Sequence, residues 1–341
     1  KMGSESRNRY LLKNTLIFTL GNIGSRMISF FLIPLYTNVL TTSQYGTVDL
    51  ITTISTVAGP MLTLNIAESV MRFGLDKDAD KEKNTQCGSI VLLIAMIIGL
   101  VLIPICRCIT EVSDYAMYVY FYVISLSASQ LFLCDLRGKE LLLKYSLGNI
   151  LQTLMIAILN ITFLLVFKME TGGYLLAYII ANFIVAIYAI IAGKGYKAFS
   201  FHNIDRCKLK EMIRYSVVLI PNTFMWWIMN SSDRVMVTYM IGAAANGIYA
   251  VSYKLPTLVS TLTGIFNQAW SYSAIREEGT SDETEYNNKM FKTLSAIAFM
   301  MGIGLLLLTK PFLGVYVADS YYDAWKYTPF LIIGCVVFSF I

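Results

Sequence analysis

The sequence predicts an all-α fold: a polytopic membrane protein with two parallel-repeat helical lobes around a central cavity, the second lobe incomplete. Three observations predict it. Hydrophobic residues make up 56% of the 341 residues, only 14% are charged, and the mean hydropathy is +0.60, whereas soluble domains are about one quarter charged. Uncharged apolar runs long enough to span a bilayer recur along the chain. The sequence also repeats weakly, at a spacing of 201 residues.

Hydropathy and helix breakers together predict nine membrane helices and the start of a tenth. They are expected near Asn14–Leu40, Val48–Phe73, Gly88–Ile109, Tyr115–Cys134, Tyr145–Phe167, Tyr174–Ala192, Ile213–Ile241, Gly247–Ile275, Phe291–Leu308 and from Thr328 onward. The last segment is still apolar at Ile341, so we expect the sequence to be a fragment. Bends are expected where a proline inside a helix removes a backbone hydrogen bond. Such prolines are Pro34, Pro60, Pro221 and Pro256.

The positive charges predict a cytoplasmic N-terminus, because cytoplasmic loops retain lysine and arginine. With this orientation the inside segments carry twenty of the 27 Lys and Arg residues and the outside segments carry four. These cations therefore report topology. The three that remain lie within predicted membrane helices: Arg26, Arg234 and Lys254.

A repeat divides the chain. Shifting the sequence by 201 residues superimposes Gly46 on Gly247 and Thr37 on Thr238. Six helices, an even number, precede the repeat point, so the two halves have the same orientation about an axis along the membrane normal. We therefore predict an N-terminal six-helix lobe at residues 1–205 and a C-terminal lobe at residues 206–341, which holds helices 7–9 and part of helix 10.

Arg26 lies near the middle of the first predicted helix, where a charge costs about 2.5–3.5 kcal/mol. Asn22, Arg26 and Ser29 share one helical face. Since no acidic residue lies at the same depth, we interpret Arg26 as a contact for an anionic ligand or a wet cavity. The alternative is a bond to backbone carbonyls or to an acid beyond the present residues.

A second charged group comprises Asp233, Arg234 and Lys254, whose depths match across a predicted helical hairpin. A local pair between Asp233 and Lys254 would leave Arg234 available, so the group is compatible with a helix–helix contact and with ligand binding. Near the inner end of the second helix, Glu68 and Arg72 are four residues apart and are expected to form a helix-surface pair.

Nothing in the sequence predicts an enzyme. The single histidine, His202, lies in a basic loop, and the six cysteines are scattered, mostly within or beside apolar runs. A membrane-bound glycosyltransferase or polymerase would need a large loop with paired carboxylates or histidine. The longest outside loop, Thr309–Tyr327, contains only Asp319 and Asp323 as acids. We predict no catalytic residue, no metal and no cofactor.

Two segments resemble a known family. Residues Gly21–Leu50, GNIGSRMISFFLIPLYTNVLTTSQYGTVDL, look like the opening of bacterial polysaccharide-unit flippases of the O-antigen and capsule type, and Asp233–Pro256, DRVMVTYMIGAAANGIYAVSYKLP, resembles their corresponding later segment. These flippases form the polysaccharide transporter family of the multidrug/oligosaccharidyl-lipid/polysaccharide exporter superfamily. The resemblance implies two six-helix lobes around a cavity that opens alternately to each side. It also implies the cargo, an undecaprenyl-diphosphate-linked oligosaccharide repeat unit, moved across the bacterial cytoplasmic (inner) membrane.

The resemblance places the cavity cations at Arg26, Arg234 and Lys254. Guanidinium and ammonium groups suit a diphosphate in a poorly screened space. We expect Arg26 to bind the diphosphate from the cytoplasmic side, after which the lobes rock while the lipid tail stays in the bilayer. The residues expected to meet the glycan are Asn22, Ser29, Asn222, Trp226, Trp227 and Asn230.

Two alternatives stay open within the superfamily. A cation-coupled multidrug antiporter would be expected to carry an acid on the first helix, where this chain has Arg26. A lipid II flippase would also have a cationic cavity. Membrane lipid and the lipid-linked oligosaccharide are the expected partners, and no nucleic acid is expected. The sequence leaves open whether protons or sodium drive transport, whether a polysaccharide polymerase binds, and which sugar unit is carried.

Overall fold

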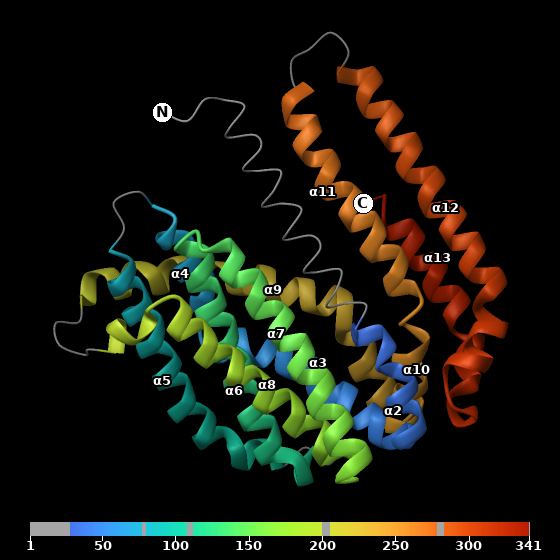
Figure 1. Cartoon of the computed structure of the whole chain (residues 1–341), viewed down its shortest axis with the longest axis horizontal. Coiled ribbons are helices and arrows are strands. Elements are labelled where there is room, and N and C mark those ends of the chain that lie inside the picture. Colours follow the sequence, from blue (N-terminus) through green and yellow to red (C-terminus); the bar gives the residue numbers. More distant parts are fainter. Residues whose placement is uncertain (1–27, 77–79, 108–111, 200–204, 278–282, 341) are drawn as a thin grey trace.

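The structure is a computed structural model that describes residues 28–76, 80–107, 112–199, 205–277 and 283–340 (Figure 1). Within these ranges the chain is helical almost throughout and contains no β-strand. This confirms the all-α class.

The helices follow the predicted apolar runs closely, and most extend beyond them into polar flanks. In the first half they are α2 (Ile33–Val39), α3 (Thr42–Leu62), α4 (Ile66–Gly74), α5 (Lys81–Arg107), α6 (Ala116–Gly138), α7 (Leu142–Ile161) and α8 (Glu170–Ala192). In the second half they are α9 (Arg206–Met240), α10 (Ala243–Ser252), α11 (Pro256–Glu277), α12 (Glu283–Tyr316) and α13 (Thr328–Phe338). Short helical turns are η1 (Ser113–Tyr115), η2 (Thr162–Val166), η3 (Gly195–Phe199) and η4 (Asp319–Lys326).

Five helices of the described chain, α5, α6, α7, α8 and α12, are long and apolar enough to cross a membrane, and α3 with α4 gives a sixth if the bent pair is one span. Large apolar side chains on these helices remain uncovered by protein, Ile97 and Val101 of α5 among them. A bilayer would cover such surfaces. α9 is longer, at 35 residues, but carries polar and charged side chains along its length. The chain is a multi-pass membrane protein.

The helices form two groups joined by a central set (Figure 1). α4–α8 pack on one side, with α6 against α4, α5 and α8, while α11, α12 and α13 pack together on the other. Between them α9 contacts both α3 and α10. The most extensive helix–helix contact in the described chain joins α3 to α10, so first-half and second-half segments meet there.

The two ends of the bundle are distinguished by their contacts. At one end Lys139 and Lys144 donate to the carbonyls of Gly193 and Ala192, where α8 ends. We call this the basic end. At the opposite end Tyr321 of η4 donates to the carbonyl of Leu40, and the loops at Thr41 and Gly242 turn between helices.

Breaks between helices lie at two of the four prolines. α3 and α4 meet at 61°, just after Pro60, and α11 begins at Pro256 after a turn that ends α10. Pro34 lies in the first turn of α2 and Pro221 lies within α9, which is one helix from Arg206 to Met240. Proline in a first turn loses no helical hydrogen bond, which explains why Pro34 is accommodated there.

The repeat is visible in the contact between α3 and α10. A Cβ atom added to Gly46 would overlap the carbonyl oxygen of Ala243, and one added to Gly247 would overlap that of Thr42. Thr42 and Ala243 are themselves 201 residues apart. Each segment therefore contacts its equivalent in the same way, as two copies related by a two-fold axis do. Glycine at both positions permits the close backbone approach.

Candidate functional site

The predicted substrate contacts are scattered, and two of them, Asn22 and Arg26, lie outside the described residues. Ser29, Asn222, Trp226 and Asn230 are all exposed. Asn230 donates its amide to the carbonyl of Trp226, one turn earlier in α9. The indole N–H of Trp227 donates to the carbonyl of Thr53 in α3, at 2.9 Å, so this tryptophan ties α9 to the first half of the chain.

Arg234 is engaged with the first half of the chain. Its guanidinium Nη1 lies 3.0 Å from Oδ1 of Asp49 on α3, and the side chains are 19% and 7% exposed, respectively. The guanidinium also lies 5.4 Å from the ring centre of Tyr253. Asn246 donates to the carbonyl of Gly46 and to Oδ2 of Asp49. In this conformation Arg234 therefore holds α9 against α3.

The local pair of Asp233 with Lys254, which the sequence left possible, does not occur among the described residues. Asp233 instead accepts a hydrogen bond from the hydroxyl of Tyr249 and caps the backbone N–H of Arg234. Lys254 is half-buried and has no ion pair among the described residues. The sequence left the group open between a helix–helix contact and ligand binding; in the structure Arg234 makes a contact between helices, with Asp49, and Lys254 is the cation without an ion pair in the described part of the chain. The partner of Arg234 is Asp49 on α3, 3.0 Å away. The predicted hairpin contains only the two helices of the second half, so it gives no sign of this contact.

The large cavity lies at a different place, between α3, α4, α6, α7 and α9, and has a volume of about 800 Å³. Its lining combines amides, hydroxyls and two tyrosine rings with a few apolar side chains. The lining residues are Thr56, Pro60, Asn65, Ala67, Glu68, Leu126, Ser129, Gln130, Leu133, Cys134, Tyr145, Asn149, Gln152, Tyr215, Leu219, Asn222 and Thr223. We call this the amide-lined cavity. Of the predicted substrate contacts in the described chain, Asn222 lies on it.

The lining suits a polar, largely neutral guest. Each Asn or Gln side chain offers one acceptor oxygen and two donor hydrogens, which matches hydroxyl groups that both donate and accept. Gln152 is held in place because its amide donates to Oδ1 of Asn182 on α8, at 2.6 Å. Tyr145 and Tyr215 add aromatic faces with a polar tip. Sequence reasoning missed Gln130, Asn149 and Gln152, although isolated amides inside apolar runs were the available signal.

Glu68 lines the amide-lined cavity, and its expected pair with Arg72 is wrong. Arg72 extends the other way along α4 and lies 2.6 Å from Asp76, with both side chains about half exposed. Because both side chains are exposed, solvent can hydrate this pair, so little desolvation opposes it. Glu68 consequently has no ion pair among the described residues, and it is the only charged side chain among those that line the cavity.

Arg137 lies beside the cavity, although its charge was counted only among the cations that indicate the orientation of the protein in the membrane. The guanidinium of Arg137, at the end of α6, is 5.5 Å from the ring centre of Tyr145, which is itself a lining residue. Stacking on an aromatic face orients an arginine and leaves its N–H edge free for an anion. The basic end of the bundle thus brings a guanidinium to the rim of a hydrogen-bonding cavity whose one charged lining residue in the described chain is Glu68.

The sequence matches one family over most of its length. Residues 11–272 match the family described as "Polysaccharide biosynthesis protein". No curated protein sequence matches the chain.

Solved structures with a similar fold are membrane transporters. A mutant of the MATE transporter VcmN from Vibrio cholerae superimposes with a TM-score of 0.62 at 15% identity, covering 97% of this chain and 81% of that one. A multidrug resistance MATE family transporter of the MOP superfamily superimposes in its outward-facing conformation with a TM-score of 0.55 at 14% identity, covering 96% and 77%. Its inward-facing conformation gives 0.53 at 14% identity, covering 95% and 78%. At these identities the likeness concerns the fold.

Proposed function

Because the chain belongs to the polysaccharide biosynthesis protein family, we propose that it is a flippase for undecaprenyl-diphosphate-linked oligosaccharide repeat units in surface polysaccharide assembly. It would act in the bacterial cytoplasmic membrane with its N-terminus inside, so that the basic end faces the cytoplasm, as the positive-inside rule requires. The transporter fold and the family membership support a membrane carrier, and the cavity supports the nature of the cargo.

The observation that carries the proposal is the lining of the amide-lined cavity. A volume of about 800 Å³ lies within the range of about 300–1,000 Å³ typical of ligand pockets. Several amides, hydroxyls and tyrosine rings converge on it, and only one charged side chain lines it in the described chain. A glycan of a few sugars presents hydroxyl groups on all sides and little charge. We therefore place the glycan in this cavity.

The diphosphate needs cations, and the chain offers them at the rim. Arg137, stacked on Tyr145, is the described guanidinium beside the cavity. Arg26 remains part of the proposal, as the membrane-embedded arginine of the first predicted helix. Arg234 is engaged with Asp49, so it would contact cargo only after that ion pair opens. Lys254 is half-buried in the second half of the chain. In this proposal it would contact the diphosphate at a later stage of transport.

Transport would proceed by rocking of the two halves against each other. The contact between α3 and α10 lies at the end opposite the basic end, so it closes the outer side while cargo enters from the cytoplasm. Opening the outer side requires Gly46 and Gly247 to separate and the Asp49–Arg234 pair to break. The lipid tail can stay in the bilayer during this exchange.

The test is a flipping assay with the complete protein in proteoliposomes that contain a fluorescent diphosphate-linked oligosaccharide lipid. A membrane-impermeant glycosidase or lectin reports the fraction of glycan in the outer leaflet. We expect the protein to equilibrate this lipid between the leaflets much faster than protein-free vesicles do. Transport of a cationic dye such as ethidium, with no movement of the glycan lipid, would contradict the proposal and favour a multidrug antiporter.

A further inference from the structure

The amide-lined cavity contains one charge that a neutral glycan does not explain. Glu68 is the only charged side chain among the described residues that line the cavity, and it forms no ion pair within the described chain. A glycan of neutral sugars would displace water from this carboxylate and offer only hydroxyl groups in return. Burying a charge without a charged partner is costly. For neutral cargo, a glutamine at this position would cost less.

The cations that could neutralise Glu68 are engaged elsewhere or lie at another depth. Arg72, one turn further along α4, pairs with Asp76 at 2.6 Å. Arg137, at the rim of the cavity, is the guanidinium that we assign to the diphosphate. Arg26, on the first predicted helix, is expected to lie at a different depth from Glu68. The carboxylate is therefore left for a positive group of the cargo.

The fold stabilises the negative charge of Glu68. This residue lies in the first turn of α4, where backbone N–H groups and the helix dipole favour a carboxylate. A carboxylate has only acceptor oxygens, so it requires donors from whatever surrounds it. Cargo that displaces water from the cavity has to replace the hydrogen bonds of that water with donors of its own. An ammonium group supplies such donors together with the opposite charge.

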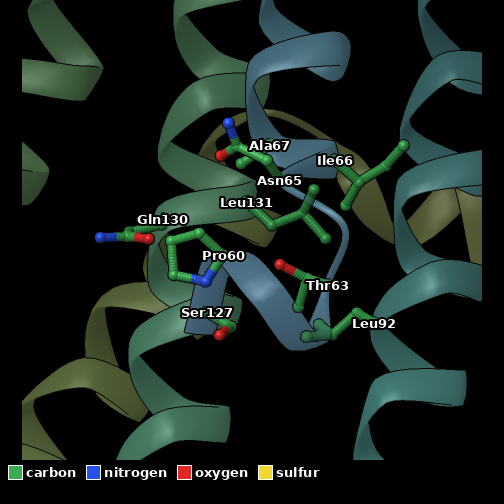
Figure 2. Close-up of a pocket in the computed structure, with 9 residues that line it drawn as sticks. All are labelled: Pro60, Thr63, Asn65, Ile66, Ala67, Leu92, Ser127, Gln130 and Leu131. Atoms are coloured by element: carbon green, nitrogen blue, oxygen red, sulfur yellow. The ribbon is translucent and has the colours of Figure 1, made fainter. Parts of the chain in front are cut away.

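Neutral oxygen acceptors line the cavity together with this carboxylate. Asn65 lies three residues before Glu68, a spacing that makes the two side chains neighbours on one helical turn. The amide nitrogen of Asn65 donates to Oγ1 of Thr223 at 3.2 Å, which leaves its amide oxygen as an acceptor. The amides of Asn65 and Gln130 lie on the side of the α3–α4 break away from Leu92 (Figure 2), and both residues line the amide-lined cavity. An ammonium group has three N–H donors, so a carboxylate and two amide oxygens match it.

We propose that Glu68 selects cargo whose glycan contains a sugar with a free amino group, and that the ammonium is bound by Glu68 with the amide oxygens of Asn65 and Gln130. A hydrogen bond between an ammonium and a carboxylate is roughly twice as strong as one between neutral groups. An N-acetylated amine is neutral and cannot replace it, and the carboxylate of a uronic acid would be repelled. This inference rests on the proposed function, because it describes one group of the same cargo.

The experiment uses the complete protein in proteoliposomes with two fluorescent diphosphate-linked oligosaccharide lipids. The lipids differ in one sugar, which has a free amino group in the first and an N-acetyl group in the second. We expect the native protein to flip the first lipid with about tenfold higher kcat/KM, the effect of one hydrogen bond to a charged group. Glu68→Gln should abolish this preference, and Glu68→Asp, which keeps the charge, should retain part of it. The matched control is Glu140→Gln, since Glu140 is an exposed glutamate just after α6 and is not a lining residue.

The ratio of the two lipids is measured in the same protein sample, so it does not depend on how much of a variant folds. Equal kcat/KM values for the two lipids in the native protein would overturn this inference alone, because flipping itself would stand. A preference that persists in Glu68→Gln, or that is lost equally in Glu140→Gln, would overturn it as well. If neither lipid moved faster than in protein-free vesicles, the proposed function would fail, and this inference with it.

Discussion

Arg234 on α9 and Asp49 on α3 form an ion pair across 185 residues of sequence, with Nη1 and Oδ1 3.0 Å apart. The repeat makes this pair asymmetric: 201 residues separate Arg234 from Ile33 and Ala250 from Asp49, so the equivalent pair is apolar. Ile33 and Ala250 belong to one buried apolar cluster. One copy of the contact is therefore the Arg234–Asp49 ion pair, and the equivalent positions, Ile33 and Ala250, are apolar and buried. The two copies of the repeat are held together by different interactions.

Arg234→Ala should destabilise the protein strongly, because it leaves Asp49 charged and unpaired in a buried position. Removing one partner of a buried pair costs about 3–5 kcal/mol. The double variant Arg234→Met with Asp49→Leu should recover much of that loss, since it removes both charges. Thermal unfolding in detergent measures Arg234→Ala, the two single variants Arg234→Met and Asp49→Leu, and the double variant, which together form a double-mutant cycle. Strictly additive effects of the two single substitutions would show that the residues do not interact.

A surface pair supplies the control. Lys326 and Asp323 in η4 lie 2.8 Å apart, and both side chains are more than half exposed. The hydrogen bond and charge of Asp323 raise the pKa of Lys326, but water screens the pair. Lys326→Ala should therefore leave the unfolding midpoint unchanged. An equal fall for Lys326→Ala and Arg234→Ala would contradict the assignment of Arg234 to a buried contact.

Gly46→Ala and Gly247→Ala should have similar, damaging effects, because each added Cβ would overlap a carbonyl oxygen of the partner segment. Overpacking typically costs about 1–3 kcal/mol. Gly304→Ala on α12 is the matched control, since nothing lies within 4 Å of the added atom, and alanine favours a helix by up to about 1 kcal/mol. Unfolding midpoints test the comparison. If Gly46→Ala were as stable as Gly304→Ala, the close contact of α3 with α10 would be wrong.

The sequence predicted the helices well because each apolar run has to be long enough to cross a bilayer, a constraint that hydropathy measures directly. It also identified the pair Gly46 and Gly247 as equivalent, although their direct contact needed the structure. The division into lobes at residues 1–205 and 206–341 stays a prediction. The bend after Pro60 was predicted, but not the left-handed backbone of Leu64 and Asn65 between α3 and α4.

Side-chain partners were harder to predict than helices. Glu68 and Arg72 are at ideal helical spacing, yet Arg72 pairs with the more hydrated Asp76. Acidic residues were compared only with the depth of Arg26, and Asp49 does not lie at that depth. A count from the helix ends could have found its true partner, since Asp49 follows Thr42 by seven residues and Arg234 precedes Ile241 by seven. A comparison of the depths of charged residues in the two halves of the repeat would therefore have predicted the Asp49–Arg234 pair.

Asn149→Ala and Asn222→Ala should weaken glycan-lipid transport without lowering stability, because each removes a lining amide of the amide-lined cavity. A net hydrogen bond contributes about 0.5–1.5 kcal/mol, so the KM for the glycan lipid should rise by about two- to tenfold for each. Leu147→Ala on the same helix as Asn149 is exposed on the surface away from protein and should leave the KM unchanged. Unchanged KM values for both asparagine variants would show that the glycan does not bind in the amide-lined cavity.

Arg137→Ala should impair transport because it removes a cation proposed to bind the negatively charged diphosphate of the cargo. The guanidinium stacked on Tyr145 can offer two parallel N–H groups to a diphosphate, and lysine cannot reproduce that geometry. We therefore expect Arg137→Lys to recover only part of the flipping rate, although it restores the charge. Lys144→Ala is the control, because Lys144 is at the same end of the bundle and donates to the carbonyl of Ala192. Inorganic diphosphate should compete with the glycan lipid in the native protein and only weakly in Arg137→Ala. Equal losses in Arg137→Ala and Lys144→Ala, with unchanged competition, would indicate a general effect of charge on membrane insertion and exclude Arg137 as a diphosphate contact.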